Sequence, residues 1–310
     1  MKQPNPTAPP LSAAEATNAQ FWRTLCPDLN VGGGAAVPDA VLGNPEGLLS
    51  RLQSEGYVNE PGVFPGCSVE RLRAGLQVLE ERGIPPVFVF VYDEFWLIFR
   101  SLDPFLQSVL GPDYRILPDC WAWFVRPSNE TAGWKPHRDR AATPFQRDAL
   151  PESLTVWLPL TDATPLNGCI HVLPAHWDEA IGNPAAEEPK EFSLSDAALQ
   201  NIRALPAPAG SLLAWNQHVL HWGGRSSARA THPRCSLALQ FQRGDRPPLA
   251  EPLLDPRALL PFRARLGLIG RLIRGYAYFE VETPPEMQVL AAALDWSFWP
   301  QGSAADGSRH

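Results

Sequence analysis

The sequence predicts a β-rich core, of the barrel or sandwich kind, with helices before and after it. From Arg115 onward, short apolar runs dense in Trp, Val and Leu alternate with Pro, Gly and Asp. Such a texture is typical of many short strands joined by turns. The 34 prolines are spread along the chain and keep its elements short. Before and after the strand-rich part, apolar residues recur at helical spacing. We expect one domain, since 310 residues can bury a sizeable core.

A helical flank is predicted over residues 13–114, after a polar, Pro-rich tail at 1–12 that we expect to be disordered and not a signal peptide. Residues 12–24 and 68–83 are expected to be helices. The stretch 86–92 is rich in β-forming residues. Two short helices are expected after it, at 94–101 and 104–110.

The core is predicted over 115–245, followed by a helical extension over 246–310. A boundary near residue 112 would separate the flank from the core rather than two independent units. An acidic, Pro-containing insertion at 176–202, with a helix near 195–203, has the position of a lid. The expected strands are 115–126, 153–160, 168–173, 211–217 and 233–243, and the expected C-terminal helices are 256–274 and 284–293.

Charge and cysteine content exclude several kinds of protein. The formal net charge of −7 argues against a nucleic-acid partner, because phosphate contacts need a basic face. Five cysteines without a CxxC pair make a thiolate zinc site or a disulfide framework unexpected, which favours a reducing, cytoplasmic location. No apolar run is long enough to cross a bilayer, so we expect no membrane partner.

Two segments carry residue types that bind metals. His137 and Asp139 are two apart, so on extended backbone they project to the same side. A distant segment supplies a third ligand, His221, with His218 as the competing candidate. Two imidazoles and one carboxylate form the facial triad of non-haem iron(II) oxygenases, which leaves positions open for a co-substrate and dioxygen.

A third segment offers an anion clamp. Arg234 and Ser236 share parity on an expected strand, and a guanidinium fork matches a carboxylate bidentately. A dicarboxylate that chelates the metal at one end would need such a clamp at the other. Each pattern alone is weak, because HxD pairs occur by chance and a strand arginine is more often a structural ion pair. The order of these patterns along the chain favours an iron site over coincidence.

At these residues the chain resembles the phytanoyl-CoA dioxygenase family of iron(II)- and 2-oxoglutarate-dependent oxygenases, from about residue 56 to 242. The matching segments are Pro136-His137-Arg138-Asp139, Leu154 to Asp162, Asn167 to His176, Gly210 to Trp215, and then His221 and Arg234.

The resemblance implies a double-stranded β-helix, a cupin-like jelly roll. It implies Fe(II) on His137, Asp139 and His221, and 2-oxoglutarate held by Arg234 and Ser236, with Trp157 lining its pocket. It further implies that O2 and 2-oxoglutarate are consumed, with release of succinate and CO2, while a substrate C–H bond is oxidised. The interval before Arg234 is slightly long, which leaves Arg225 or Arg229 as lesser candidates.

The carboxylate of Asp139 favours hydroxylation, because related halogenases have a small residue there. Desaturation, epimerisation and cyclisation stay open, since the same oxidant serves them. Two rivals also remain: a cupin-like metal enzyme that does not use 2-oxoglutarate, and a non-catalytic jelly-roll binding protein.

The substrate is expected to be a small metabolite: an amino acid, a natural-product intermediate or an acyl derivative. Pocket candidates are Trp123, Trp134, His218 and Trp222. Trp121 shares parity with Trp123, and packing in the core is the alternative for both. The arginines at 263, 265, 271 and 274 are expected on a solvated helix face. The oligomeric state has no signal in the sequence.

Overall fold

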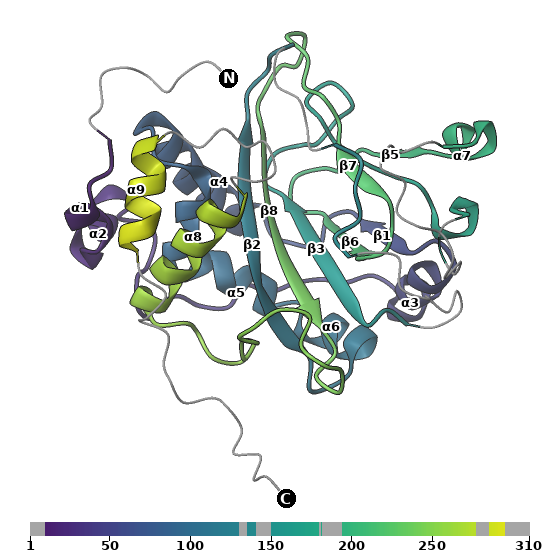
Figure 1. Cartoon of the computed structure of the whole chain (residues 1–310), viewed down its shortest axis with the longest axis horizontal. Helices are drawn as coiled ribbons and strands as arrows, with labels where there is room; N and C mark the ends of the chain where they lie inside the picture. The colour runs from purple at the N-terminus through teal and green to yellow at the C-terminus, as the bar shows by residue number, and fades with distance from the viewer. Residues whose placement is uncertain are drawn as a thin grey trace, which may run out of the picture.

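Two antiparallel sheets lie at the centre of the computed structural model, which describes residues 10–129, 135–140, 150–179, 181, 194–276 and 285–294 (Figure 1). Within these residues, the larger sheet has the strand order β1-β6-β3-β8-β2, and the smaller has the order β5-β4-β7. The strands are β1 (Tyr57–Glu60), β2 (Arg115–Val125), β3 (Ser153–Pro159), β4 (Ile170–Val172), β5 (Arg203–Leu205), β6 (Leu212–Asn216), β7 (His221–Gly223) and β8 (Arg234–Gln242).

Strand β8 lies between β3 and β2 and is buried along its whole length. Successive side chains of a strand point to opposite faces. One set, which includes Leu237, Leu239 and Phe241, packs into the main hydrophobic core. The other set, Arg234, Ser236, Ala238 and Gln240, is turned to the opposite face of the sheet. Both faces of β8 are covered, but only the set that packs into the main core is wholly apolar, while the opposite set is mostly polar.

Helices cover the outer face of the larger sheet, beside β2 and β8 in Figure 1. The main core joins residues of these helices to the apolar face of the sheet. The helices are α1 (Ala13–Ala16), α2 (Ala19–Leu25), α3 (Pro45–Ser54), α4 (Gly66–Glu81), α5 (Glu94–Arg100), α6 (Asp103–Leu110), α7 (Asp196–Gln200), α8 (Phe262–Tyr276) and α9 (Pro285–Ala293), with 3₁₀ turns η1 (Pro86–Val91) and η2 (Ala175–Trp177).

The β-forming stretch 86–92 is not a strand, and that indication was wrong. It forms the 3₁₀ helix η1, whose residues Val87 to Val91 are buried on all sides. This turn contacts β2, α4 and α8. Tertiary packing between a sheet and two helices therefore overrides the β propensity of this apolar run, as it often does for short segments.

The bounds of other elements also differ from the prediction. The single helix expected at 12–24 is two helices, because the side chain of Asn18 caps a new helix by accepting a hydrogen bond from the amide of Gln20. The helix expected from 256 begins only at Phe262, directly after Pro261. Elements α3, β1, β5 and β7 have no counterpart in the prediction. Short strands such as β5 and β7, of three residues each, carry too few positions for a periodic pattern.

Helix α8 is fixed to the N-terminal flank by a buried ion pair. Arg265 is 1% exposed, and its Nη1 lies 2.6 Å from Oδ1 of Asp93. The same guanidinium donates a hydrogen bond to the carbonyl of Val91, while Asp93 accepts bonds from the amides of Gly32 and Gly33. The expectation of a solvated face is therefore wrong for Arg265, although Arg263 of the same helix is exposed.

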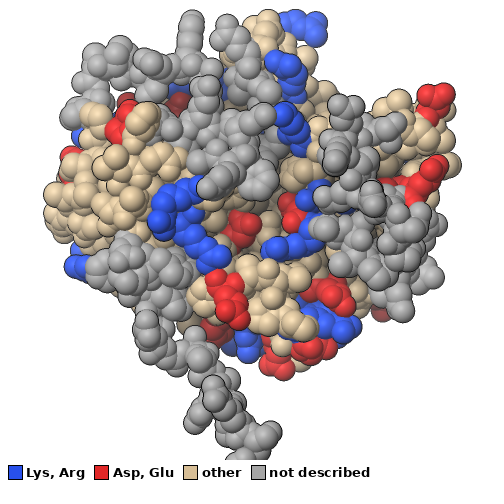
Figure 2. All heavy atoms as spheres, in the orientation of Figure 1, with Lys and Arg blue, Asp and Glu red and all other residues tan. Residues whose placement is uncertain are grey.

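The predicted β core with flanking helices is confirmed, and the helices are more extensive than expected. Residues 180 and 182–193 of the insertion predicted at 176–202 lie outside the described residues, which include η2 and α7 near its two ends. No helix of the described residues is long and apolar enough to cross a membrane. Figure 2 shows Lys and Arg interspersed with Asp and Glu over the face that it presents.

Candidate metal centre

His137 and His221 come together through main-chain pairing. Each residue donates its amide to the carbonyl of the other at 3.0 Å, which forms an isolated antiparallel bridge. Their ring centroids lie 4.4 Å apart. The bridge thus brings two imidazoles together from segments more than eighty residues apart in the sequence.

Asp139 completes the cluster. Its Oδ1 lies 3.6 Å from Nε2 of His137 and 3.6 Å from Nε2 of His221. One ligand atom from each of the three residues lies within 4.8 Å of the others, which is close enough for a single ion to contact all three. The structure brings together the three residues that the sequence proposed as ligands.

Both imidazoles are oriented through Nδ1. Nδ1 of His137 lies 2.7 Å from the carbonyl of Lys135, and Nδ1 of His221 lies 3.0 Å from the carbonyl of Val219. A carbonyl can only accept, so Nδ1 carries the proton and Nε2 keeps its lone pair toward Asp139. Metal-binding histidines usually have this arrangement, since the second nitrogen fixes the tautomer and the ring orientation.

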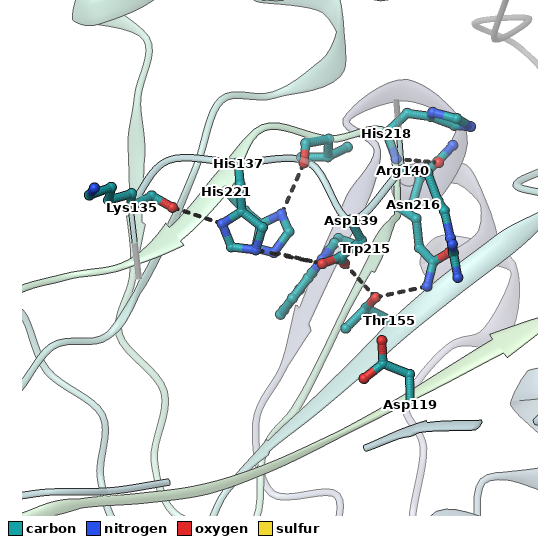
Figure 3. A network of polar contacts seen from close by, with 12 residues as sticks. Asp119, Lys135, His137, Asp139, Arg140, Thr155, Trp215, Asn216, His218 and His221 are labelled. Carbon is teal, nitrogen blue, oxygen red and sulfur yellow. Dashed lines mark hydrogen bonds and ion pairs between the residues drawn. The ribbon is translucent and has the colours of Figure 1, made fainter. Parts of the chain in front are cut away.

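Asp139 is held by two donors that the sequence analysis did not single out. The hydroxyl of Thr155 donates to Oδ2 at 2.6 Å, and Nε1 of Trp215 donates to the same oxygen at 3.1 Å (Figure 3). Thr155 in turn accepts a hydrogen bond from Nε2 of Gln217. Oδ2 is therefore engaged by the protein, and Oδ1 is the oxygen turned to the two histidines.

The electrostatics of the cluster favour a charged carboxylate and a neutral His221. Burial alone raises the pKa of the Asp139 carboxyl, but attraction to His221 and His137 and the bond from Thr155 bring this pKa well below its usual range. Burial lowers the pKa of His221 to about 4. Burial also lowers the pKa of His137, but contact with Asp139 outweighs it and the net direction is upward.

The cluster lies in the wall of a cavity that encloses about 580 Å³ of space, part of it open to solvent. His137 and Asp139 are half-buried on the open side, while His221 is buried. Strands β2, β3, β4, β6, β7 and β8 and the end of α8 contribute the remaining wall, with Trp121, Trp123 and Trp157 among its aromatic residues.

Arg234 lies in the same wall and is 3% exposed. Its Nη1 donates to the hydroxyl of Ser236 at 2.7 Å, and its guanidinium stands over the rings of Trp123 and Trp157 at 6.0 and 5.7 Å. No carboxylate of the described residues forms an ion pair with it, and its Nε has no hydrogen-bond partner among them. Burial lowers its pKa to about 10.

The lesser candidates for this role are excluded by position. Arg225 and Arg229 are exposed, and neither lines the cavity. The interval before Arg234 is occupied by a turn that leaves Arg234 as the first residue of β8.

Of the three described residues among those proposed for the substrate pocket, one lines the cavity. Trp123 lines the cavity. His218 and Trp222 are not among the described residues that line it. The amide of His218 donates to Asn216 and its carbonyl accepts from Arg138, whereas the ring of Trp222 stacks on His171 at 5.6 Å. Trp134 lies outside the described residues.

The local backbone structure explains why His221, and not His218, joins the cluster. His218 and His221 are three positions apart but lie in different local structures. His221 begins strand β7 and pairs with His137, while His218 lies in the turn before it. Only His221 joins the candidate metal cluster.

Three further polar residues of the cavity were not identified as candidates for the site from the sequence: Asp119, Gln240 and Tyr276. Asp119 follows a proline in what looked like an ordinary strand, and Gln240 shares the strand parity of Arg234 and Ser236. That parity was the one available signal, because residues 234, 236, 238 and 240 all face the cavity side of β8.

Comparison with known proteins adds to this geometry. No sequence among curated proteins matches the chain. Residues 96–232 match the model of the phytanoyl-CoA dioxygenase (PhyH) family. This segment contains all three candidate ligands and ends just before Arg234.

Solved structures share the fold. One is the non-heme alpha ketoglutarate dependent epimerase SnoN from nogalamycin biosynthesis, with a TM-score of 0.52 and 18% identity over 70% of this chain and 94% of that one. SnoN in complex with Fe3+, alpha ketoglutarate and nogalamycin RO gives 0.51, at the same identity and coverage. The apo form of the non-heme monooxygenase ThoJ gives 0.52, at 18% identity over 74% of this chain and 99% of that one. The resemblance noted from the sequence is thus confirmed over residues 96–232, the segment that matches the phytanoyl-CoA dioxygenase family model.

Proposed function

We propose that the protein is an iron(II)- and 2-oxoglutarate-dependent oxygenase with a jelly-roll core, in which His137, Asp139 and His221 hold the metal. The observation that carries this proposal is the buried Arg234, in the same cavity wall as the triad and without a carboxylate partner among the described residues. A buried cation is costly unless an anion accompanies it. A dicarboxylate that reaches from the metal to this guanidinium supplies that anion.

The donor set suits the metal. Two imidazoles and a carboxylate on one side of an ion leave adjacent coordination positions for a bidentate co-substrate and for dioxygen. Bound iron supplies the oxidising chemistry, and 2-oxoglutarate is converted to succinate and CO2 in the process.

The chain's own residues position these groups. Arg234 offers a planar fork to the distal carboxylate of 2-oxoglutarate, and Ser236 adds a hydroxyl beside it. Trp157 and Trp123 flank the guanidinium and keep water from this end of the cavity. Thr155 and Trp215 hold Oδ2 of Asp139, so that Oδ1 stays aimed at the metal.

We propose hydroxylation of an unactivated C–H bond of a small metabolite as the outcome. Asp139 fills the coordination position that a chloride ion would need for halogenation. The fold does not select among the other outcomes, since fold and reaction are separable and SnoN is named an epimerase. Chlorinated product found by mass spectrometry after turnover in chloride buffer would contradict the assignment of Asp139.

The decisive test is an anaerobic titration of the protein with Fe(II) and 2-oxoglutarate, followed by visible absorption. The proposal expects a metal-to-ligand charge-transfer band that requires both components and, after oxygen is admitted, formation of succinate. The Arg234→Ala variant should need far more 2-oxoglutarate to develop the band.

Two results would favour a rival. Substrate turnover without 2-oxoglutarate indicates the cupin-like metal enzyme. Absence of the band in wild-type protein that has bound iron indicates a binding protein that keeps the fold without the chemistry.

A further inference from the structure

A second polar group lies in the cavity, apart from the triad and from Arg234. It consists of Asp119 on β2, Gln240 on β8 and Tyr276 at the end of α8, and all three line the cavity. The proposed metal and co-substrate sites use none of them. They form a distinct part of the wall, which we call the Asp119 corner.

An irregularity in β2 creates this corner. In the pairing of β2 with β8, Ile116 opposes Phe241 and Cys120 opposes Leu239, so three residues of β2 face the single residue Gln240. Such bulges bend a strand and re-aim a side chain, and they are frequent beside active sites. Here the bulge holds Pro118, which has no amide to donate to the ladder, and it brings Asp119 to the cavity side.

The corner adjoins the metal site through Thr155. Gln240 pairs with Thr155 across β3 and β8, and opposed residues of an antiparallel pair project to the same face. Thr155 donates its hydroxyl to Asp139. In Figure 3, Asp119 lies on the Thr155 side of this network, and no dashed line joins it to the residues drawn. A molecule held in the corner therefore lies next to the metal.

Arg234 lies at the far end of this arrangement. It is the first residue of β8 and pairs with Val125, at the opposite end of the β2–β8 ladder from Gln240. A co-substrate that runs from the metal to Arg234 occupies the Trp123 and Trp157 side of the cavity. The Asp119 corner is left for the substrate.

Two acceptors in the corner lack a donor. Gln240 is 9% exposed, and its Oε1 has no hydrogen-bond partner among the described residues. Asp119 accepts one hydrogen bond, at 2.6 Å from the hydroxyl of Tyr276 to Oδ1, and within the described chain its Oδ2 has none. The Gln240 oxygen is a buried acceptor without a donor, which is costly, and Asp119 has intermediate exposure with one oxygen turned to no donor; together they point to a ligand that donates.

The charges of the cavity indicate what kind of donor this is. Fe(II) with Asp139, and Arg234 with the two carboxylates of 2-oxoglutarate, together sum to zero formal charge. Asp119 is then the remaining charge among the lining residues. Arg140 and Arg271 are near enough to favour its ionised form, but neither hydrogen-bonds it, and burial raises the pKa of its carboxyl overall. A cation beside Asp119 would neutralise the corner.

Aromatic rings complete the corner. The rings of Trp121 and Tyr276 lie 4.4 Å apart at an angle of 51°, both residues line the cavity, and the hydroxyl of Tyr276 contacts the carboxylate. Faces of aromatic rings attract ammonium groups, and the attraction grows when water is excluded. A carboxylate, an amide oxygen and two aromatic rings together match a protonated amine better than a neutral alcohol or an anion.

We propose that the Asp119 corner binds a protonated amine of the substrate, and that this contact positions the neighbouring C–H bond at the metal. The inference rests on the proposed oxygenase function for the role of the metal, but the corner itself is built from residues outside the metal site. It names the substrate class as amine-bearing small molecules.

The test compares matched probes on the iron-loaded protein with 2-oxoglutarate under anaerobic conditions. Benzylamine, which is cationic at pH 7, is compared with benzyl alcohol, and cyclohexylamine with cyclohexanol, by calorimetric titration. Wild-type protein should bind each amine at least about tenfold more tightly than its alcohol, as expected for a desolvated charge pair. Asp119→Asn should abolish this preference with little change in alcohol binding, and Gln240→Leu should weaken it several-fold.

Asp113→Asn serves as the control, because Asp113 is exposed just before β2 and does not line the cavity. It should keep the amine preference. Thermal unfolding of each variant separates loss of binding from loss of the fold. Equal affinity for amine and alcohol in the wild type, no binding of either amine, or an unchanged preference in Asp119→Asn overturns the proposal.

The charge-transfer band distinguishes this failure from failure of the proposed function. If the band forms in wild-type and Asp119→Asn protein but no amine preference is found, the oxygenase assignment stands and the corner assignment falls. If the band never forms, the oxygenase assignment falls, and amine binding can still be measured on the metal-free protein.

Discussion

The hydroxyl of Thr155 donates a 2.6 Å hydrogen bond to Oδ2 of Asp139, the carboxylate shared by both histidines of the triad. Trp215 donates to the same oxygen. Together these bonds leave Oδ1 as the oxygen that faces Nε2 of His137 and of His221. The orientation of the carboxylate is therefore set by β3 and β6, not by the segment that carries Asp139.

Replacing Thr155 with Val should lower iron(II) affinity by about 10- to 100-fold, because groups that orient a metal ligand typically contribute this much. The ligands themselves stay in place, so saturating iron should restore binding. Thr161→Val is the matched control: its hydroxyl is also hydrogen-bonded, but to the main chain of Pro233 and Cys235 and not to a ligand. Competition against a chelator measures the affinity. Equal affinities of the Thr155 and Thr161 variants would show that the hydrogen bond does not orient Asp139.

Substitutions of His221 and of His218 should differ clearly in their effect on iron binding. His221→Ala removes a member of the three-residue cluster and is expected to purify without iron after reconstitution. His218→Ala should retain close to one iron per chain, because this side chain lies outside the cluster and does not line the cavity. Iron is measured by atomic emission after gel filtration. Iron retained by the His221 variant and lost by the His218 variant would reverse the assignment of the third ligand.

Arg234→Ala should raise the dissociation constant for 2-oxoglutarate by about 30-fold or more, as expected when one partner of a buried charge pair is removed. Arg234→Lys should recover only part of this affinity, since an ammonium cannot form the bidentate fork. Without 2-oxoglutarate, the Ala variant should melt no lower than the wild type, because it removes a buried cation that has no carboxylate partner among the described residues.

The exposed Arg225 provides the control for this experiment. Arg225→Ala should leave 2-oxoglutarate affinity unchanged, as measured by the charge-transfer band. An unchanged dissociation constant in the Arg234 variant would remove the main support for the co-substrate site.

Arg265→Met should destabilise the protein by about 3–5 kcal/mol, because it leaves Asp93 buried without its cation. Arg263→Met, on the exposed side of the same helix, should change stability by less than about 0.5 kcal/mol. Urea unfolding measures both. Adding Asp93→Asn to Arg265→Met should cost less than the sum of the single changes, since the two residues are in contact. Strict additivity would indicate that the ion pair contributes nothing.

Much of the site was predictable from the sequence because it depends on short spacings and on residue chemistry. His137 and Asp139 lie in one short segment, and their separation of two positions carries the same-side geometry. Arg234 and Ser236 likewise share parity on one strand, which places both side chains on the same face, where they form a hydrogen bond. The order of these segments along the chain, together with the family-like motifs, was enough to select iron and 2-oxoglutarate.

The tertiary structure decided what depends on strand register and on packing between distant segments. Thr155 and Trp215 reach Asp139 only because β3, β6 and the 135–140 segment meet, and a shift of one residue would turn either side chain away. The bulge that turns Asp119 toward Gln240 and Tyr276 is an irregularity in pairing, which composition does not encode. Local sequence thus determined the metal-binding chemistry, whereas the contacts that orient it and the corner proposed for the substrate arise from pairing between strands far apart in the chain.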